Sequence, residues 1–206
     1  MLFRSRAAAG LACASRMILP IVKYGHPVLR KKGDRIQKIT PEILRLIADM
    51  METMRAARGV GLAAQQIGRP LQLAVADVSE ITDRPSTLHL EGKPVPVESF
   101  MPVILINPEI KPVGEPATGP EGCLSFPEIY ADVTRPESVA VKAQNAEGKV
   151  LTFQCGGLLA RAIQHEVDHL NGILFIDRME TTKRRELKTE LEVLQEETKA
   201  TLQAKR

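Results

Sequence analysis

The chain has 206 residues, with 28 Lys and Arg against 25 Asp and Glu, which gives a formal net charge of +3. One hydrophobic core is expected at this length, and the small charge excess argues against a dedicated nucleic-acid-binding protein, as do the scarce aromatic residues (3%, no Trp). No apolar run reaches the length of a membrane span, and three cysteines without paired spacing favour a reducing compartment over a disulfide framework.

Residues 1–16 differ in composition from the rest of the chain. They contain three arginines and many alanines but no acid, because the first acidic residue is Asp34. Such a stretch is compatible with a targeting segment. Met17, however, opens a run that is typical of a chain start. We therefore expect a disordered N-terminal extension over residues 1–16 and a cytoplasmic protein, with organellar targeting as the alternative.

The first predicted helix begins after Thr40. Thr40 is suited to the N-cap, Pro41 to the first helical position and Glu42 to the first turn. Apolar residues then recur at helical spacing until Gly59 ends the helix. The glycines and alanines of residues 59–68 indicate backbone that lies close to a ligand or, equally well, a tight packing turn.

The middle of the chain predicts strands and turns. Strands are expected at residues 71–78, 102–108, 130–134, 138–143 and 150–155. Asn107-Pro108 should close the second of these strands, and a Pro- and Gly-rich connection should follow it. Residues 79–98 indicate a loop or irregular hairpin, and residues 146–149 a hairpin turn. The sequence thus predicts an α+β fold: mostly antiparallel β-sheets packed around a central buried helix, with an N-terminal and a C-terminal helix.

The central helix follows Gly156-Gly157, and Asn171-Gly172 should end it. It carries an HExxH motif, in which His165 and His169 lie four residues apart and therefore on one face. Two imidazoles beside a carboxylate are typical of a hydrolytic metal site, with Glu166 able to handle the proton of a water molecule. The alternative is that these are ordinary polar residues of a buried or solvated helix.

A metal site of this kind needs a third ligand. A third histidine of the metzincin type is missing, because Phe175 occupies that position, and Glu190 or Glu192 lies on a helix without a partner motif. Cys123 is the remaining candidate, since a thiolate binds zinc or ferrous iron well and three ligands leave one position for water. Taken alone, Cys123 is better explained as a small buried apolar residue.

The last predicted element is a charged helix from residue 180 to residue 206, without Pro or Gly. Leu187, Leu191 and Leu194 mark a narrow apolar edge. It is either a docking arm for a larger acidic partner or a solvated terminal helix.

Three segments together resemble the peptide deformylase family. The segment GVGLAAQQ at residues 59–66 is similar to its first motif, EGCLS at 121–125 to its second, and QHEVDH at 164–169 to its third. The motifs occur in the family's order, and the similarity covers residues 17–178. Two positions depart from it: some members carry arginine in place of Tyr130, and Arg161 replaces an apolar residue, which affects the rim of the substrate pocket.

The resemblance implies hydrolysis of the formyl group from the N-terminal formyl-methionine of new polypeptides, with release of formate. Cys123, His165 and His169 would hold one Fe²⁺ per chain, with Zn²⁺, Ni²⁺ or Co²⁺ as substitutes. Metal-bound water would attack the formyl carbon, and Glu166 would act as general base and acid. The partners implied are formyl-methionyl nascent peptides, with ribosome docking through the C-terminal helix, and neither DNA nor a membrane.

The resemblance also implies roles for other residues. The side-chain amide of Gln66 and the N–H of Leu124 would stabilise the oxyanion. The remaining implied positions are Val60, Gly61 and Gly122 for the substrate backbone, Leu158 and Ala162 for the methionine pocket, and Glu121, Asp168 and Arg135 around the imidazoles. We accordingly expect a catalytic domain at residues 17–178 and a C-terminal helix at 179–206. A non-catalytic, metal-stabilised binding protein is the rival reading, which Glu166 and Gln66 disfavour.

Overall fold

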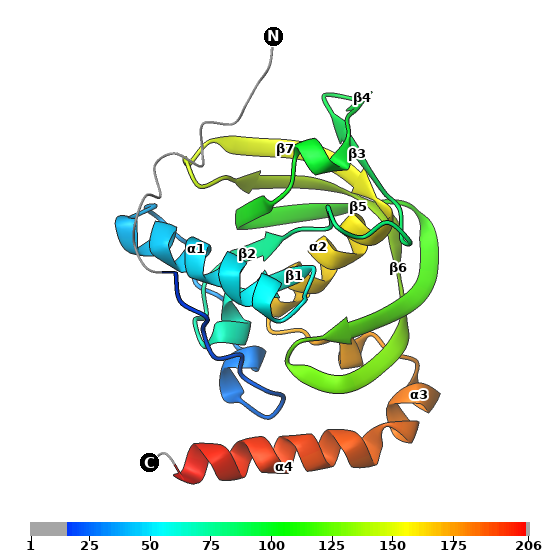
Figure 1. Cartoon of the computed structure of the whole chain (residues 1–206). Coiled ribbons are helices and arrows are strands. Elements are labelled where there is room, and N and C mark those ends of the chain that lie inside the picture. Colours follow the sequence, from blue (N-terminus) through cyan, green and yellow to red (C-terminus); the bar gives the residue numbers. More distant parts are fainter. Residues whose placement is uncertain (1–15, 205–206) are drawn as a thin grey trace.

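The computed structural model describes residues 16–204 (Figure 1). The expected extension over residues 1–16 lies outside this range except for Arg16. The strands pair antiparallel in the order β1-β2-β5-β6-β7-β3-β4. Their bounds are Gly61–Ala63 (β1), Leu73–Ala76 (β2), Ser86–Leu90 (β3), Lys93–Pro94 (β4), Val103–Cys123 (β5), Phe126–Gln144 (β6) and Val150–Gly156 (β7). With the helices described below, the α+β class is confirmed.

Helices cover both faces of the sheet around β1, β2 and β5 (Figure 1). Helix α1 (Pro41–Ala56) packs its apolar stripe against Leu73 and Val75 of β2, whereas α2 (Gly157–Leu170) packs against Ala74 and Ala76. This division follows from the two-residue alternation of side chains along a strand. The sheet is therefore the middle layer, and α2 is buried beneath it.

Local sequence explains where α1 begins. The side chain of Thr40 accepts a hydrogen bond from the N–H of Ile43 at 3.5 Å, and Pro41 occupies the first turn, where no backbone donor is needed. The helix ends at Ala56, and Arg58 adopts a left-handed conformation (φ 55°). The expected stop at Gly59 thus occurs slightly earlier in the chain.

The long β5–β6 hairpin differs from the prediction. Asn107-Pro108 does not close a strand, since β5 continues to Cys123, and the two strands expected at 130–134 and 138–143 form parts of β6. A register shift between Ile106 and Glu109 absorbs the irregular dipeptide, with Asn107 left-handed (φ 51°). The Asn107 amide also bonds both backbone groups of Ile36 at 2.9 Å. In the sequence alone, such a bulge has the same pattern as the end of a strand, which is why the prediction divided β5 and β6 into shorter pieces.

The C-terminal segment forms two helices where one was expected, α3 (Thr181–Glu186) and α4 (Lys188–Ala204), which meet at Leu187. Leu187, Leu191 and Leu194 pack on a cluster that includes Phe126 and Phe175, and Leu191 is only 7% exposed. We attribute the break to this packing, since Leu187 turns toward the cluster. Within residues 16–204, no helix combines the length and apolar character needed to span a membrane.

Short 3-10 helices complete the described chain. They lie at Pro27–Arg30, Ala64–Ile67, Val97–Ser99 and Phe175–Asp177. The hairpin of β3 and β4 agrees with the irregular hairpin predicted at 79–98. In the turn before β7, the N–H of Asn145 donates to the carbonyl of Lys149 at 3.0 Å.

Leu105 of β5 is fully buried between the sheet and α2. We expect Leu105→Ala to lower the free energy of unfolding by about 2–5 kcal/mol, because the lost side chain leaves a cavity. Val150→Ala, at a position 65% exposed on β7, is the control and should cost less than about 1 kcal/mol. Urea unfolding measures both; equal losses would contradict the assignment of this layer as the core.

Candidate metal centre

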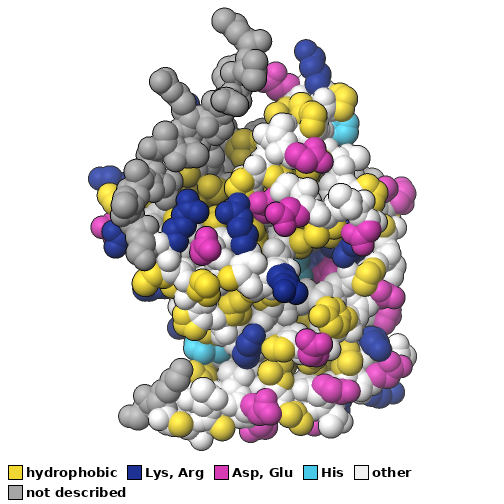
Figure 2. Space-filling model, viewed as in Figure 1, with side chains coloured by type: hydrophobic (Ala, Val, Ile, Leu, Met, Phe, Trp, Pro, Cys, Tyr) yellow, Lys and Arg dark blue, Asp and Glu magenta, His cyan; other side chains and the backbone are white. Residues whose placement is uncertain are grey.

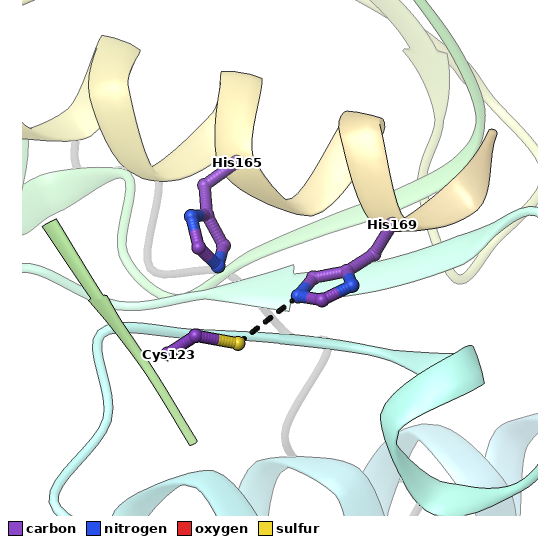
Figure 3. Close-up of side chains that lie close together, drawn as sticks. All are labelled: Cys123, His165 and His169. Carbon is purple, nitrogen blue, oxygen red and sulfur yellow. Dashed lines mark hydrogen bonds between the residues drawn. The ribbon is translucent and has the colours of Figure 1, made fainter. Parts of the chain in front are cut away.

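The three predicted metal ligands come from two elements, the end of β5 and helix α2. Their side chains lie close together (Figure 3). Cys123 is the last residue of β5 and is half-buried. His165 and His169 project from the same face of α2, toward the thiol (Figure 3). The Sγ of Cys123 and Nε2 of His169 are 3.3 Å apart, and the donor atoms of the three residues all lie within 4.8 Å of one another.

The donor set fits a divalent transition metal. A thiolate and two imidazoles are ligands that zinc and ferrous iron both accept, and three protein ligands leave a coordination position open. The surface view shows a hollow on this face, with a histidine and an acidic side chain visible in its depth (Figure 2). The arrangement therefore suits a cation that small molecules can reach.

Glu121 holds the ring of His165. Its carboxylate lies 3.0 Å from His165 Nδ1 and accepts two hydrogen bonds from Arg135, at 2.6 and 2.9 Å. Burial alone would raise the pKa of Glu121, but hydrogen bonds from His165 and Arg135 outweigh it and lower the pKa to about 2. A carboxylate bonded to Nδ1 fixes the ring with Nε2 free to face the other two donors.

Asp168 has a different environment. It accepts hydrogen bonds from Arg135 at 2.7 Å and from Arg178 at 2.6 and 3.1 Å. The described hydrogen bonds to the Asp168 carboxylate all come from arginines, so that Asp168 orients Arg135 and, through it, Glu121. Arg135 itself is 4% exposed, and within residues 16–204 its side chain donates to these two carboxylates.

Arg161 takes part in this network, although the sequence analysis placed it only at the rim of the substrate pocket. It donates to Glu121 at 2.8 Å and to the carbonyl groups of Ala117 and Val133, each at 2.8 Å. The sequence signal that could have predicted this role is the position of Arg161 one helical turn before His165, because residues four apart share a helix face. The partners of Arg161, however, lie on β5 and β6, far away in the sequence.

Glu166 is a buried carboxylate that lies against the first motif. It is 4% exposed, and its Oε2 has no hydrogen-bond partner among the described residues. Burial raises its pKa to about 7, against the opposing charges of His165 and Arg135. Gly61 lies directly against it, and a Cβ at residue 61 would collide with Oε1. The missing side chain is thus what allows the first motif to approach the helix.

The two imidazoles have different electrostatic surroundings. Burial lowers the pKa of His169, and the charge of His165 adds to this effect. Burial acts in the same direction on His165, but its hydrogen bonds with Cys123 and Glu121 outweigh it and raise its pKa.

Gln66 lies beside the thiol. Its Oε1 accepts a hydrogen bond from the N–H of Ala63 at 2.8 Å, which orients Nε2 toward Cys123 Sγ at 3.5 Å. Leu124 follows Cys123 in the two-residue connection to β6, and its side chain lies against Gly59 of the first motif. The structure thus brings the segments of Gln66, Cys123 and Leu124 together.

The predicted substrate residues surround this centre at different depths. Gly61 is in β1, at the outer end of the sheet order, and Gly122 is exposed near the end of β5. Leu158 and Ala162 are 7% and 5% exposed on α2, and Leu158 lines a cavity of about 230 Å³ together with Gly119 and Arg161. Val60 is half-buried beside β1.

The sequence and fold were compared with known proteins. The polypeptide deformylase family model matches residues 18–185. A peptide deformylase of Opitutus terrae is 47% identical over 89% of this chain and 96% of its own length, and one of Methylacidiphilum infernorum is 48% identical over 85% and 92%. A plant peptide deformylase has a TM-score of 0.77 at 34% identity, covering 92% of this chain and 95% of its own. An enzyme of Synechococcus elongatus, solved in complex with actinonin, has a TM-score of 0.71 at 38% identity over 86% and 88%. The chain therefore belongs to the polypeptide deformylase family.

Proposed function

We propose that Cys123, His165 and His169 hold one divalent cation, Fe²⁺ in the cell, and that the formyl amide is hydrolysed at this centre. As a family member, the chain is a metal-dependent hydrolase that removes the formyl group from the N-terminus of new polypeptides. The observation that carries the proposal is the mutual approach of the three donor atoms to within 4.8 Å. Fe²⁺ accepts this mixed sulfur and nitrogen set, as do Zn²⁺, Ni²⁺ and Co²⁺.

Glu166 is the proton carrier in this proposal. When bound, the cation supplies a Lewis acid and lowers the pKa of a water ligand. The free Oε2 of Glu166 takes a proton from the attacking water and delivers it to the leaving amine, and a pKa of about 7 suits both transfers near neutral pH. The burial of Glu166 keeps bulk water from competing for that proton.

Gln66 and Leu124 stabilise the negative charge that develops on the formyl oxygen. The Nε2 of Gln66 is already oriented by the bond between its Oε1 and Ala63. The N–H of Leu124 lies next in the chain to the proposed ligand Cys123. Donors that are oriented before the reaction need no reorganisation during it, which is why such pairs lower barriers effectively.

The substrate peptide would add as an extended strand beside Val60-Gly61 and Gly122, and its methionine side chain would contact Leu158 and Ala162. The position of β1 at one end of the sheet order and the exposure of Gly122 support this placement. Glu121, Arg135 and Asp168 would keep the imidazoles in place without contacting substrate.

We further propose that residues 17–178 form the catalytic domain and that the C-terminal helices, residues 179–206, dock on the ribosome. The last turn of α3 carries Lys183, Arg184 and Arg185, a charge that suits a phosphate-rich surface. A protein that docks on the ribosome acts where translation takes place. This is the cytoplasm or, if residues 1–16 are a targeting segment, an organelle.

Glu166→Gln should retain the metal but lower kcat on a formyl-methionyl dipeptide by about 10²–10⁴-fold, since the amide cannot accept the proton. Formate release and elemental analysis measure the two quantities. Glu147→Gln, in the exposed turn before β7, is the control and should leave both unchanged. Turnover near the wild-type rate would refute the role of Glu166.

Cys123→Ala should lose most of the bound metal, because only two of the three proposed protein ligands, the imidazoles of His165 and His169, remain. Cys155→Ala is a matched control: Cys155 is buried in β7 and belongs to the core facing α2. Elemental analysis of protein purified without oxygen should find one metal ion per chain in Cys155→Ala and much less in Cys123→Ala. A full complement in Cys123→Ala would show that the third ligand lies elsewhere.

Iron bound by a thiolate should make the enzyme sensitive to oxidation. Protein purified anaerobically is expected to contain iron and to lose activity on exposure to peroxide, whereas protein reloaded with Ni²⁺ should keep it. The comparison uses one preparation divided in two. Equal activity of the untreated and nickel-reloaded protein after aerobic storage without reductant would contradict the predicted sensitivity and point to zinc or nickel instead.

A further inference from the structure

Residues 22–24, which we call the N-terminal clasp, lie between the two segments that carry the proposed oxyanion donors. The N–H of Val22 donates to the carbonyl of Gln66 at 2.8 Å, and the N–H of Tyr24 donates to the carbonyl of Ser125 at 2.9 Å. Between them, Lys23 Nζ donates to the carbonyl of Leu124 at 2.9 Å. Three consecutive residues thus bond to both segments.

Lys23 is the member of the clasp that contributes a side-chain bond. It forms no ion pair within 4.0 Å among residues 16–204, so its ammonium group is held on a neutral carbonyl. Its half-buried position lowers its pKa, and the charge of Cys123 acts in the opposite direction. A charged donor gives a stronger hydrogen bond than a neutral one, and a partly buried bond is shielded from water.

The bonded carbonyl matters because of where Leu124 lies. Leu124 and Ser125 are the two residues between β5 and β6, so no strand ladder holds their peptide groups. The carbonyl of Leu124 is held by Lys23, and the carbonyl of Ser125 by Tyr24. The Leu124 N–H lies in the preceding peptide plane, which is joined to Cys123 at the end of β5. Holding the carbonyl of Leu124 limits the backbone torsions at Leu124 and, through them, the direction of that N–H.

We infer that Lys23 is a positioning residue of the oxyanion site: it holds the Leu124 peptide while the neighbouring N–H of Val22 holds Gln66, which sets the two donors relative to each other. The inference rests on the proposed function of Gln66 and Leu124. Lys23 need not touch the substrate. Its contribution is geometric, and a donor displaced by a fraction of an ångström stabilises the transition state less.

Lys23→Met removes the bond and keeps most of the apolar stem. We expect kcat for a formyl-methionyl peptide to fall about tenfold, with KM within about twofold, because the donors act mainly on the transition state. Metal content and thermal midpoint should stay at wild-type values. In protein labelled with ¹³C, the carbonyl resonance of Leu124 should shift, since it loses its hydrogen-bond donor.

Two further variants separate positioning from a general structural effect. Lys23→Arg should recover most of the lost kcat, because a guanidinium group can donate to the same carbonyl. Lys32→Met removes an exposed lysine from the same N-terminal stretch and should behave as wild type. Unchanged kcat in Lys23→Met would overturn the inference. So would a loss that follows metal content or thermal midpoint and that Lys23→Arg does not recover.

Gln66→Ala, assayed in parallel, distinguishes this inference from the function on which it rests. Slow turnover in Gln66→Ala together with full turnover in Lys23→Met would overturn the role of Lys23 and leave the oxyanion site intact. Full turnover in Gln66→Ala would overturn both.

Discussion

The buried carboxylate of Glu121 is the constraint on which the rest of the centre depends. It accepts hydrogen bonds from Arg135 and Arg161 and contacts His165, so that β5, β6 and α2 meet at one side chain. Removing a charge from water costs several kcal/mol unless it is paired, and breaking such a pair leaves its partner uncompensated. The network therefore admits few alternative arrangements, and the direction of the His165 ring follows from it.

The same network explains how a buried helix can carry so many polar residues. On α2, Gln164, His165, Glu166, Asp168 and His169 are all buried. Gln164 donates to the carbonyl of Pro136 at 2.9 Å, and Asp168 bonds two arginines. The groups left without a partner among the described residues include Glu166 Oε2 and His169 Nδ1. Within residues 16–204, Gln65 and Ser125 also carry buried side-chain atoms without a partner. Of these unpartnered groups, Glu166 Oε2 is the one that the proposed proton transfer uses.

Much of this arrangement could be predicted from local sequence, and the rest could not. The spacing of His165 and His169 placed both on one helix face, and Thr40-Pro41 gave the start of α1, since such patterns act within one turn. The continuation of β5 past Asn107 depended on an amide reaching Ile36, and the partners of Arg161 lie on β5 and β6. Contacts between distant segments leave no periodic signal in one sequence. For this reason, the family resemblance supported Cys123 as a candidate ligand more strongly than any spacing of residues did.

The packing of α4 beside Gly25, the residue after the clasp, joins two segments that are far apart in the sequence. Gly25 has φ 103°, and a Cβ there would lie 2.8 Å from the backbone oxygen of Gln195. Because Gly25 and Gln195 are separated by most of the described chain, this contact can form only after the β-sheet and α2 between them have been synthesised. Until then, the apolar cluster to which Val22 and Tyr24 contribute lacks Leu191 and Leu194 of α4.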